Sequence, residues 1–325
     1  MKNLRYYAMS LAMAGPLCLF PGYGWAQSYP AKVVRYLLPF AASGGNDIVA
    51  RIMAAGLAKA LGQQVIVENR PGAGGNIGTE IAARAPADGY TVLQISATNA
   101  VNVTLYRNLP YDLVRDFAPV TQLASLPSVL VVHPSLPVKS VGDLVKLAKA
   151  KPGQLNYSSA GVGTFTFFAA ELFKGHSGVD ILHVPYRGGG ASLNAVISGE
   201  TTVYFPPLAV ALPHMPQGRM RGLAVTSAKR VPMLPELPTI AEAGYPGYES
   251  VNWYGLLVPA RTPNEVIETI RSAAVSVLND PGVSKRLGDL GCVLIGDRPE
   301  QFAAHIKSEI EALAKIIKQT GITAN

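Results

Sequence analysis

The sequence predicts an α/β protein with two lobes, each built on a mostly parallel β-sheet flanked by helices. Short apolar runs alternate with segments of helical periodicity along most of the chain, an order typical of parallel strands joined by helical crossovers. The 325 residues are 49% hydrophobic and only 15% charged, as expected when strands are buried on both faces. The length allows one large domain or two medium ones.

The first 26 residues have the pattern of a secretory signal peptide. Lys2 and Arg5 precede the mostly apolar stretch 8–20, and small residues stand three positions and one position before the expected cut after Ala26. An uncleaved anchor is the alternative, but the apolar stretch is short and is interrupted by a proline. We therefore expect an exported mature chain of residues 27–325.

The composition of the mature chain excludes several classes of function. Without the two basic residues of the signal peptide, the formal net charge falls from +7 to +5, and no basic cluster predicts a nucleic-acid partner. Cys292 is then the only cysteine, which excludes an intramolecular disulfide and a cluster of thiolate metal ligands. The five histidines lack metal-ligand spacing, and no G-x-S-x-G motif is present. We expect no metal and no catalytic residues.

The first third of the mature chain has the order strand, helix, strand, helix, strand. Ile48 and Ile52 recur on one face of the first helix, and Gly62 is its predicted stop. The strands are predicted at 33–38, 65–67 and 90–95, and the helices at 47–61 and 77–85.

The same alternation continues in a second α/β unit, and the last third is rich in helices. Ser140 is a predicted helix cap, and Pro263 stands at a predicted helix start. The predicted strands are 128–133, 155–157, 180–184, 202–205, 223–225 and 253–258, and the predicted helices are 140–150, 164–174, 189–197, 263–278 and 299–319.

The lobe boundaries follow from where an uninterrupted strand could cross from one lobe to the other. Such crossings are predicted near 120–130 and 220–230. Lobe 1 is then 27–125 plus 226–325, and lobe 2 is 126–225.

Ligands in open α/β sheets bind beyond the carboxyl ends of the strands, so the loops after the strands are candidate sites. The loop 39–47 places Ser, Gly and Asn at a helix start, which is either an anion site or a plain capped turn. The loop 158–164 has the same character in the second lobe, and the two loops could hold one anion between them. The segment 96–99 offers hydroxyl donors, although a capped helix start explains it better when it is taken alone.

A glycine-rich segment raises the alternative of a dinucleotide site. Gly72, Gly74 and Gly78 fit a loose G-x-G-x-x-x-G pattern. However, the segment follows the second strand of the unit, and no acid stands at the end of a following strand to hold a ribose. We expect no cofactor.

Several longer motifs, taken in order, resemble the periplasmic receptors of tripartite tricarboxylate transporters, often called Bug proteins. The resemblance covers nearly the whole mature chain and makes the Gly72 segment a structural motif of the family. The matching stretches are 39–51, 67–78, 86–91, 157–164, 183–188, 223–227 and 238–244.

The resemblance implies a Venus-flytrap fold, like that of periplasmic binding proteins, and a function as a periplasmic receptor rather than an enzyme. Backbone N–H groups and ordered waters of the cleft would hold a small carboxylate, and the receptor, expected to be a monomer, would deliver it to membrane transporter subunits. The implied ligand-binding residues are Phe40, Ala41, Ser43, Gly44, Asp47, Ser96, Thr98, Ser159, Gly161, Val162, Gly163, Thr164 and Tyr186.

The chain departs from the family pattern where polar groups are usual. Phe167 stands in place of a histidine, and Pro206-Pro207 in place of an acid. Since Phe165 and Pro206 occupy motif positions that face the cleft, we expect an aromatic or otherwise hydrophobic carboxylate to be preferred over citrate. Two other functions stay open: a sensor that feeds a membrane signalling partner, and a secreted enzyme, for which no nucleophile or cofactor loop is found.

Overall fold

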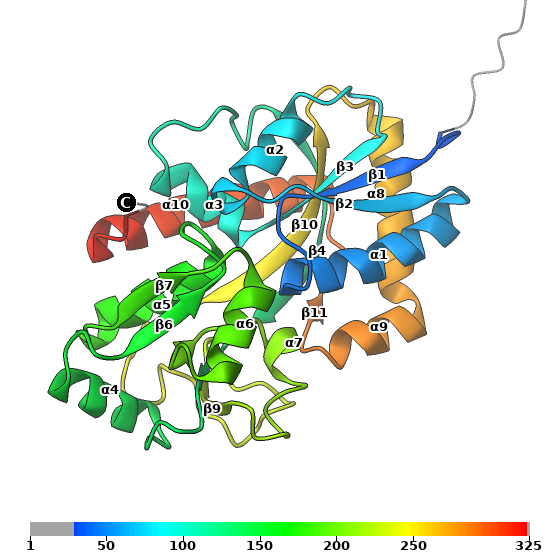
Figure 1. Ribbon diagram of the computed structural model, residues 1–325. Helices are drawn as coiled ribbons and strands as arrows, with labels where there is room; N and C mark the ends of the chain where they lie inside the picture. The colour runs from blue at the N-terminus through cyan, green and yellow to red at the C-terminus, as the bar shows by residue number, and fades with distance from the viewer. Residues whose placement is uncertain (1–28, 324–325) are drawn as a thin grey trace, which may run out of the picture.

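The computed structural model describes residues 29–323, which form two β-sheets with helices packed around them (Figure 1). The predicted signal peptide lies outside the described residues. None of the helices in the described range combines the length and hydrophobicity needed to cross a membrane.

The larger sheet has six strands, in the spatial order β11-β4-β10-β3-β1-β2. Strands β1 and β2 are parallel, as are β1 and β3, whereas β10 is antiparallel to both β3 and β4. The sheet is thus mixed, and not mostly parallel, because one long strand leaves this lobe and another returns to it. The strands are β1 (Val34–Leu38), β2 (Val65–Asn69), β3 (Thr91–Ser96), β4 (Phe117–Pro127), β10 (Val251–Pro259) and β11 (Val293–Leu294).

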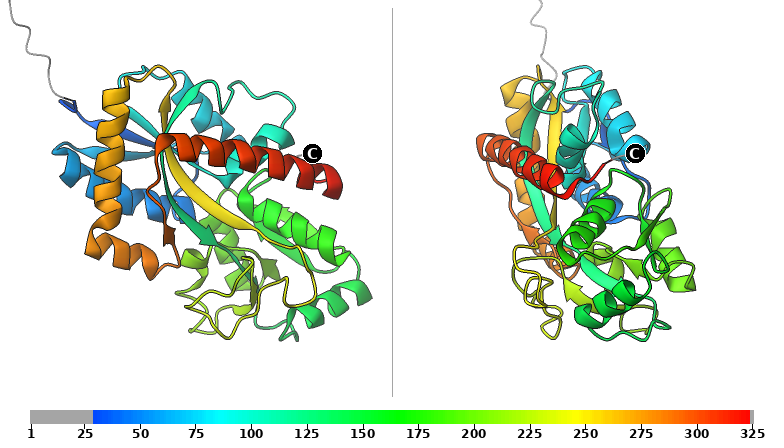
Figure 2. Two further views of the ribbon diagram at one scale, coloured as in Figure 1. Left: turned by 180° about the vertical axis from the view of Figure 1, so that it is seen from behind. Right: turned by 90° about the vertical axis from the view of Figure 1, so that its left-hand side faces the viewer.

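Helices cover both faces of this sheet, and α8 and α10 lie on the face seen from behind in Figure 2. Gly56 lets α1 approach Val277 of α8, and Gly255 of β10 lies directly beneath Phe302 of α10, so a side chain at either glycine would clash. The helices are α1 (Gly45–Leu61), the 3-10 turn η1 (Ala73–Gly75), α2 (Asn76–Ala83), α3 (Ala97–Leu105), α8 (Asn264–Asn279), α9 (Pro281–Gly288) and α10 (Pro299–Thr320).

The smaller sheet has five strands, in the order β7-β6-β8-β5-β9. Strand β6 is parallel to β7 and β8, and β5 is antiparallel to β8 and β9, so this sheet is mixed as well. Its elements are β5 (Val129–Val132), α4 (Val141–Ala150), β6 (Asn156–Ser159), α5 (Phe165–Ser177), β7 (Leu182–Pro185), α6 (Gly189–Ser198), β8 (Val203–Tyr204), α7 (Leu208–Ala211) and β9 (Arg221–Val225).

The chain crosses between the sheets where three segments meet. Strand β4 runs on through Ser128 into β5, while Thr226 N–H donates to Ser128 O at 2.9 Å and Ser250 N–H donates to Thr226 O at 2.8 Å. Residues 226–250 remain beside the smaller sheet, since Thr239 pairs with Val225. The predicted lobe boundaries stay a prediction, and this pairing favours a return crossing near Ser250.

The predicted elements are present, with ends that differ by a few residues, and their local signals act as expected. Gly62, at a φ of 66°, ends α1, and Ser140 Oγ caps α4 by accepting from Asp143 N–H at 3.1 Å. The elements α7, α9, β4 and β11 were not predicted separately, and α3 was predicted only as a helix start.

Candidate functional site

A cavity of about 500 Å³ lies between the two sheets and takes its walls from both. Strands β1, β3, β6 and β7 end at it, and the helices that follow them (α1, α3, α5 and α6) begin at it, together with the turn that precedes α2. Unpaired N–H groups and the helix dipoles make such helix starts attractive to anions. The helix starts therefore make the cavity suited to an anion through its backbone groups.

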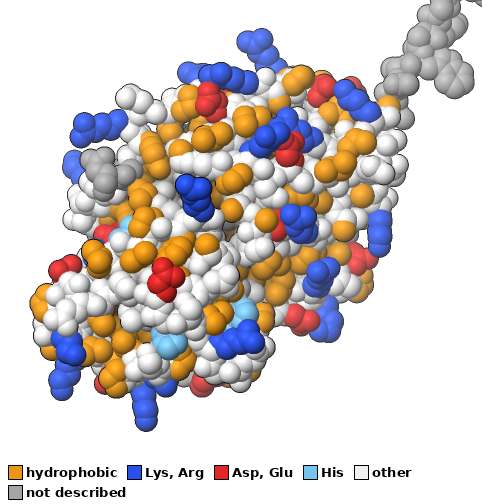
Figure 3. Space-filling model, viewed as in Figure 1, with side chains coloured by type: hydrophobic (Ala, Val, Ile, Leu, Met, Phe, Trp, Pro, Cys, Tyr) orange, Lys and Arg blue, Asp and Glu red, His pale blue; other side chains and the backbone are white. Residues whose placement is uncertain are grey.

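The side chains around the cavity add little charge. Among the described residues that line it, Arg187 is the only one with a charged side chain, and it is exposed. Groups of three or more His, Cys, Asp or Glu side chains that could hold a metal ion are absent from residues 29–323. On the face shown in Figure 3, Lys and Arg side chains are scattered and do not form one patch. The geometry suits a small anion held by neutral donors.

Most of the predicted ligand-binding residues come together at this cavity. They come from the loops after β1, β3, β6 and β7, which are far apart in the sequence. Those that line the cavity are Phe40, Ala41, Gly44, Thr98, Gly161, Val162, Thr164, Phe165 and Tyr186. Those that do not line it are Ser43, Asp47, Ser96, Ser159, Gly163 and Pro206.

Asp47 lies behind the first loop and holds it in shape. Its carboxylate is 5% exposed and accepts hydrogen bonds from Ser43 N–H at 3.1 Å, Arg51 Nε at 2.8 Å and Asn69 Nδ2 at 2.9 Å. Asn69 Nδ2 also donates to Phe40 O at 3.0 Å. Burial alone would raise the pKa of Asp47, but the hydrogen bonds and the Arg51 charge lower it below its ordinary value. Asp47 is thus a scaffold for residues 40–43.

Ser159 has the equivalent position behind the loop of the second lobe. Its Oγ lies 2.6 Å from His183 Nε2 and accepts from Gly161 N–H at 3.1 Å, which fixes the turn that lines the cavity. The His183 ring stacks on Tyr157 and contacts Phe167, with ring centroids 4.8 and 4.9 Å away. Burial lowers the pKa of His183 to about 4, so its ring is neutral near pH 7.

At both places where the chain departs from the family pattern, one apolar residue lines the cavity and a nearby one does not. Phe165 lines the cavity, whereas Phe167 packs against His183. Likewise Pro207 lines the cavity, but Pro206 does not. The apolar wall expected from the sequence is present, although one residue of each pair faces elsewhere.

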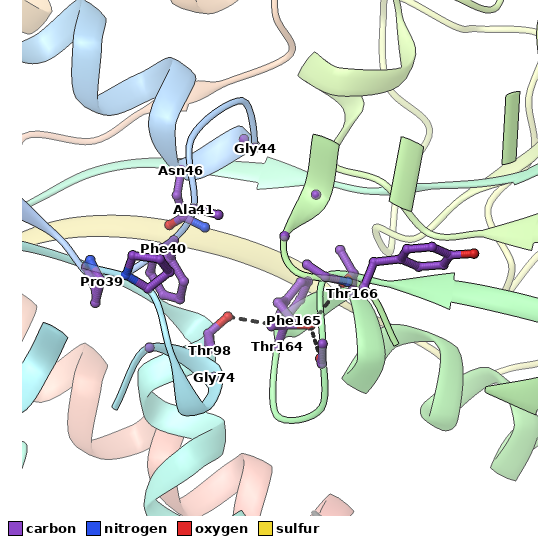
Figure 4. Close-up of a pocket in the computed structure, with 18 of the residues that line it drawn as sticks. Pro39, Phe40, Ala41, Gly44, Asn46, Gly74, Thr98, Thr164, Phe165 and Thr166 are labelled. Atoms are coloured by element: carbon purple, nitrogen blue, oxygen red, sulfur yellow. Dashed lines mark hydrogen bonds between the residues drawn. The ribbon is translucent and has the colours of Figure 1, made fainter. Parts of the chain in front are cut away.

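The two lobes contact each other at two places on the rim of the cavity, Gly188 with Ala41 and Gly74 with Val162, which are called the lips below. A Cβ added to Gly188 would lie 2.6 Å from Ala41 Cβ, and one added to Gly74 would lie 3.2 Å from Val162 O. Across the cavity, Thr98 Oγ1 accepts from Phe165 N–H at 3.0 Å, which joins the first turns of α3 and α5 (Figure 4). The molecule is therefore closed around the cavity.

Several lining residues were not predicted from the sequence. Asn252 comes from the strand β10 and reaches the start of α3, 155 positions away in the chain. Asn46 directly follows the predicted loop glycines and could have been included with them. The other unpredicted lining residues include Tyr106, Tyr204, Pro207, Val210 and the segment 71–75.

Two mixed α/β lobes closed over a cavity at the ends of their strands define the class of periplasmic-binding-protein-like folds. Residues 49–322 match the model of the tripartite tricarboxylate transporter family receptor, and the chain belongs to this family. It is a family of binding proteins and not of enzymes, as the sequence predicted.

Relatives agree along nearly the whole chain. A UPF0065 protein encoded in the tcbD–tcbE intergenic region of Pseudomonas sp. strain P51 is 38% identical over 299 residues, covering 92% of this chain and 89% of its own. The solved structure of Rhodopseudomonas palustris Rpa4515 with adipate is 36% identical, with a TM-score of 0.88, and covers 91% of this chain and 99% of its own. That of MatC from the same species with bound malate is 30% identical, with a TM-score of 0.85, and covers 89% and 100%.

Proposed function

We propose that this protein is a periplasmic receptor that binds a small carboxylate in the interlobe cavity and delivers it to the membrane subunits of a tripartite tricarboxylate-type transporter. The observation that carries the proposal is the convergence of helix starts from both lobes on a cavity whose described lining contains no acidic side chain. Backbone dipoles and bridging water bind an anion well without a fixed countercharge. The signal-peptide pattern and the family support the periplasmic location and the transporter partner.

The arrangement of the helix starts favours an acid with two carboxylates. Helices α1 and α6 approach each other at Gly44 and Gly189, and α3 and α5 approach each other at Thr98 and Phe165. Each pair contains one helix from each lobe, so each carboxylate would hold both lobes together. The relatives crystallised with adipate and malate bind acids of this kind.

The wall between the two pairs of helices favours an apolar ligand body. Phe40, Phe165 and Pro207 line it, and Figure 4 shows the rings of Phe40 and Phe165 on opposite sides of the cavity. A third carboxylate, as in citrate, would have to be desolvated against these groups. Adipate or an aromatic acid is therefore expected to bind more tightly than citrate.

The test is a thermal-shift screen of residues 27–325, unfolded and refolded to remove any carried-over ligand. The panel holds adipate, malate, benzoate, citrate and the amide of each acid. An acid that binds only the native state stabilises it by about 2.7 kcal/mol at a hundredfold excess over its Kd. A shift with an acid and none with its amide is the expected result. No shift with any acid would contradict the proposal, and the tightest binding by citrate would contradict its apolar preference.

A further inference from the structure

The cavity contains one buried side-chain donor whose orientation is fixed by the fold. Asn252 lies on β10, lines the cavity and is 1% exposed. Its Oδ1 accepts from Ala97 N–H at 3.2 Å and from Trp253 N–H at 3.0 Å. Because two backbone donors require an oxygen at that position, the amide cannot be flipped without leaving both unpaired. The Nδ2 group must therefore be the other end of the amide.

This Nδ2 group has two protons. Tyr254, on the same strand, can accept one of them through its hydroxyl, and no residue in the range 29–323 accepts the other. A buried donor without a partner costs free energy, and native proteins seldom retain one unless a ligand or water pairs with it. Asn252 lies beside the start of α3, where Thr98 also lines the cavity. A hydrogen-bond acceptor of the ligand is the partner that this site lacks.

We propose that Asn252 is a specificity-determining residue that donates from Nδ2 to a carboxylate oxygen of the ligand and rejects ligands that present an ammonium or amide N–H there. The proposal rests on the proposed function, because it concerns the same cavity. It narrows the ligand class to acids without an amino group at this end. The cavity lining supports the same selection. The described residues that line it include no acidic side chain that could pair with an ammonium group.

The position of Asn252 also couples ligand binding to closure. Strand β10 pairs with β4, with Asn252 opposite Leu126, and Ser250 at the start of the strand contacts the crossing at Thr226. A ligand held by Asn252 is thus held by the strand that joins the lobes. The remaining contacts to such a ligand come from loops at the ends of strands.

The variant Asn252→Asp removes the Nδ2 donor and keeps an oxygen for the two backbone N–H groups. Its carboxylate still offers an oxygen to Ala97 N–H and Trp253 N–H, but replaces Nδ2 by a second acceptor. Calorimetry would measure the Kd values of adipate, its monoamide and 6-aminohexanoate. Loss of a hydrogen bond to a charged group predicts that adipate binds about tenfold to a hundredfold more weakly. The affinity for 6-aminohexanoate relative to adipate should rise by at least as much.

Arg107→Gln is the matched control, because it also lowers the net charge by one next to the lining residue Tyr106 while leaving the cavity itself unchanged. Equal effects of the two variants would reduce the role of Asn252 to long-range charge and overturn the proposal. If Asn252→Asp does not fold, the wild-type protein provides the test. A wild type that binds 6-aminohexanoate as tightly as adipate would also overturn the proposal. A wild type that binds no acid of the panel would instead remove the proposed function, and this inference with it.

Discussion

At the scale of single residues, polar side chains divide into those that face the cavity and those that shape its loops. The family resemblance implied Ser43, Asp47 and Ser159 as ligand contacts, and all three stand in loops at strand ends. The structure places Asp47 and Ser159 behind those loops, hydrogen-bonded to the backbone that does line the cavity. Loop composition identifies a site but does not show on which side of the loop a side chain lies, because that depends on distant partners such as Asn69 and His183.

Replacing Asp47 by alanine should affect stability more than selectivity. The change leaves Ser43 N–H, Arg51 and Asn69 without their acceptor and should cost about 1–3 kcal/mol of unfolding free energy. All ligands should bind more weakly by a similar factor, since the whole loop loosens. Urea unfolding and a comparison of the adipate and benzoate Kd values check this. A change in the ratio of the two affinities would show that Asp47 contacts the ligand.

The neutral state of His183 predicts a particular loss of stability in acid. The folded pKa of about 4 lies below the ordinary value of 6.5, so between these two pH values only the unfolded chain takes up the proton. The contribution of His183 is present above about pH 6.5 and is lost as the pH falls toward 4. His183→Phe should reduce the difference in unfolding free energy between pH 7 and pH 5. An unchanged difference in His183→Phe would contradict this prediction.

At the scale of elements, strong periodicity was predictable and context-dependent structure was not. Helix α1 has an apolar face and a glycine stop, and its end was predicted to the residue. Helix α3 is rich in Asn, Thr and Val, which have modest helix propensity. It is stabilised by Asn99 Oδ1, which accepts from Ser96 N–H at 3.0 Å, and by packing on α10. The first contact is the capped helix start that segment 96–99 suggested, whereas the packing on α10 cannot be read from the local sequence.

A methyl group added at Gly188, in the contact between the lobes, should oppose closure. In Gly188→Ala the new Cβ would meet Ala41 of the opposite lobe, and the φ of 107° adds local strain. Overpacking of this kind costs about 1–3 kcal/mol in the closed form, so adipate should bind about tenfold to a hundredfold more weakly. Gly218→Ala is the control, because it has a φ of 69° but open space around it. A similar loss of affinity in the control would assign the effect to backbone strain.

At the scale of the whole molecule, the two lobes are joined through strands whose side chains also reach the cavity. Trp253 is the only tryptophan after residue 26, and its Nε1 donates to Glu309 of α10 at 3.0 Å. Because it adjoins Asn252 on β10, we expect saturating adipate to change its fluorescence. The two-lobed fold was predictable from the alternation of elements. The Asn252 contact was not, because it joins residues 155 positions apart.

The same fluorescence signal distinguishes ligand binding from closure. Asn252→Asp should lose most of the change at an adipate concentration that saturates the wild type, whereas Arg107→Gln should retain it. X-ray scattering of the wild type should give a smaller radius of gyration with adipate than without it. An unchanged radius would mean that the lobes are already closed in the absence of ligand.

The contact between the lips sets a limit in time as well as in space. The contacts of Gly188 with Ala41 and of Gly74 with Val162 narrow the way out of the cavity. We therefore expect the rate at which the lobes open to limit the dissociation rate constants of weakly bound ligands. Residence times of poor ligands should approach the lifetime of the closed form, whereas ligands that stabilise the closed form should stay longer, and any partner that separates the lobes controls when the ligand is released.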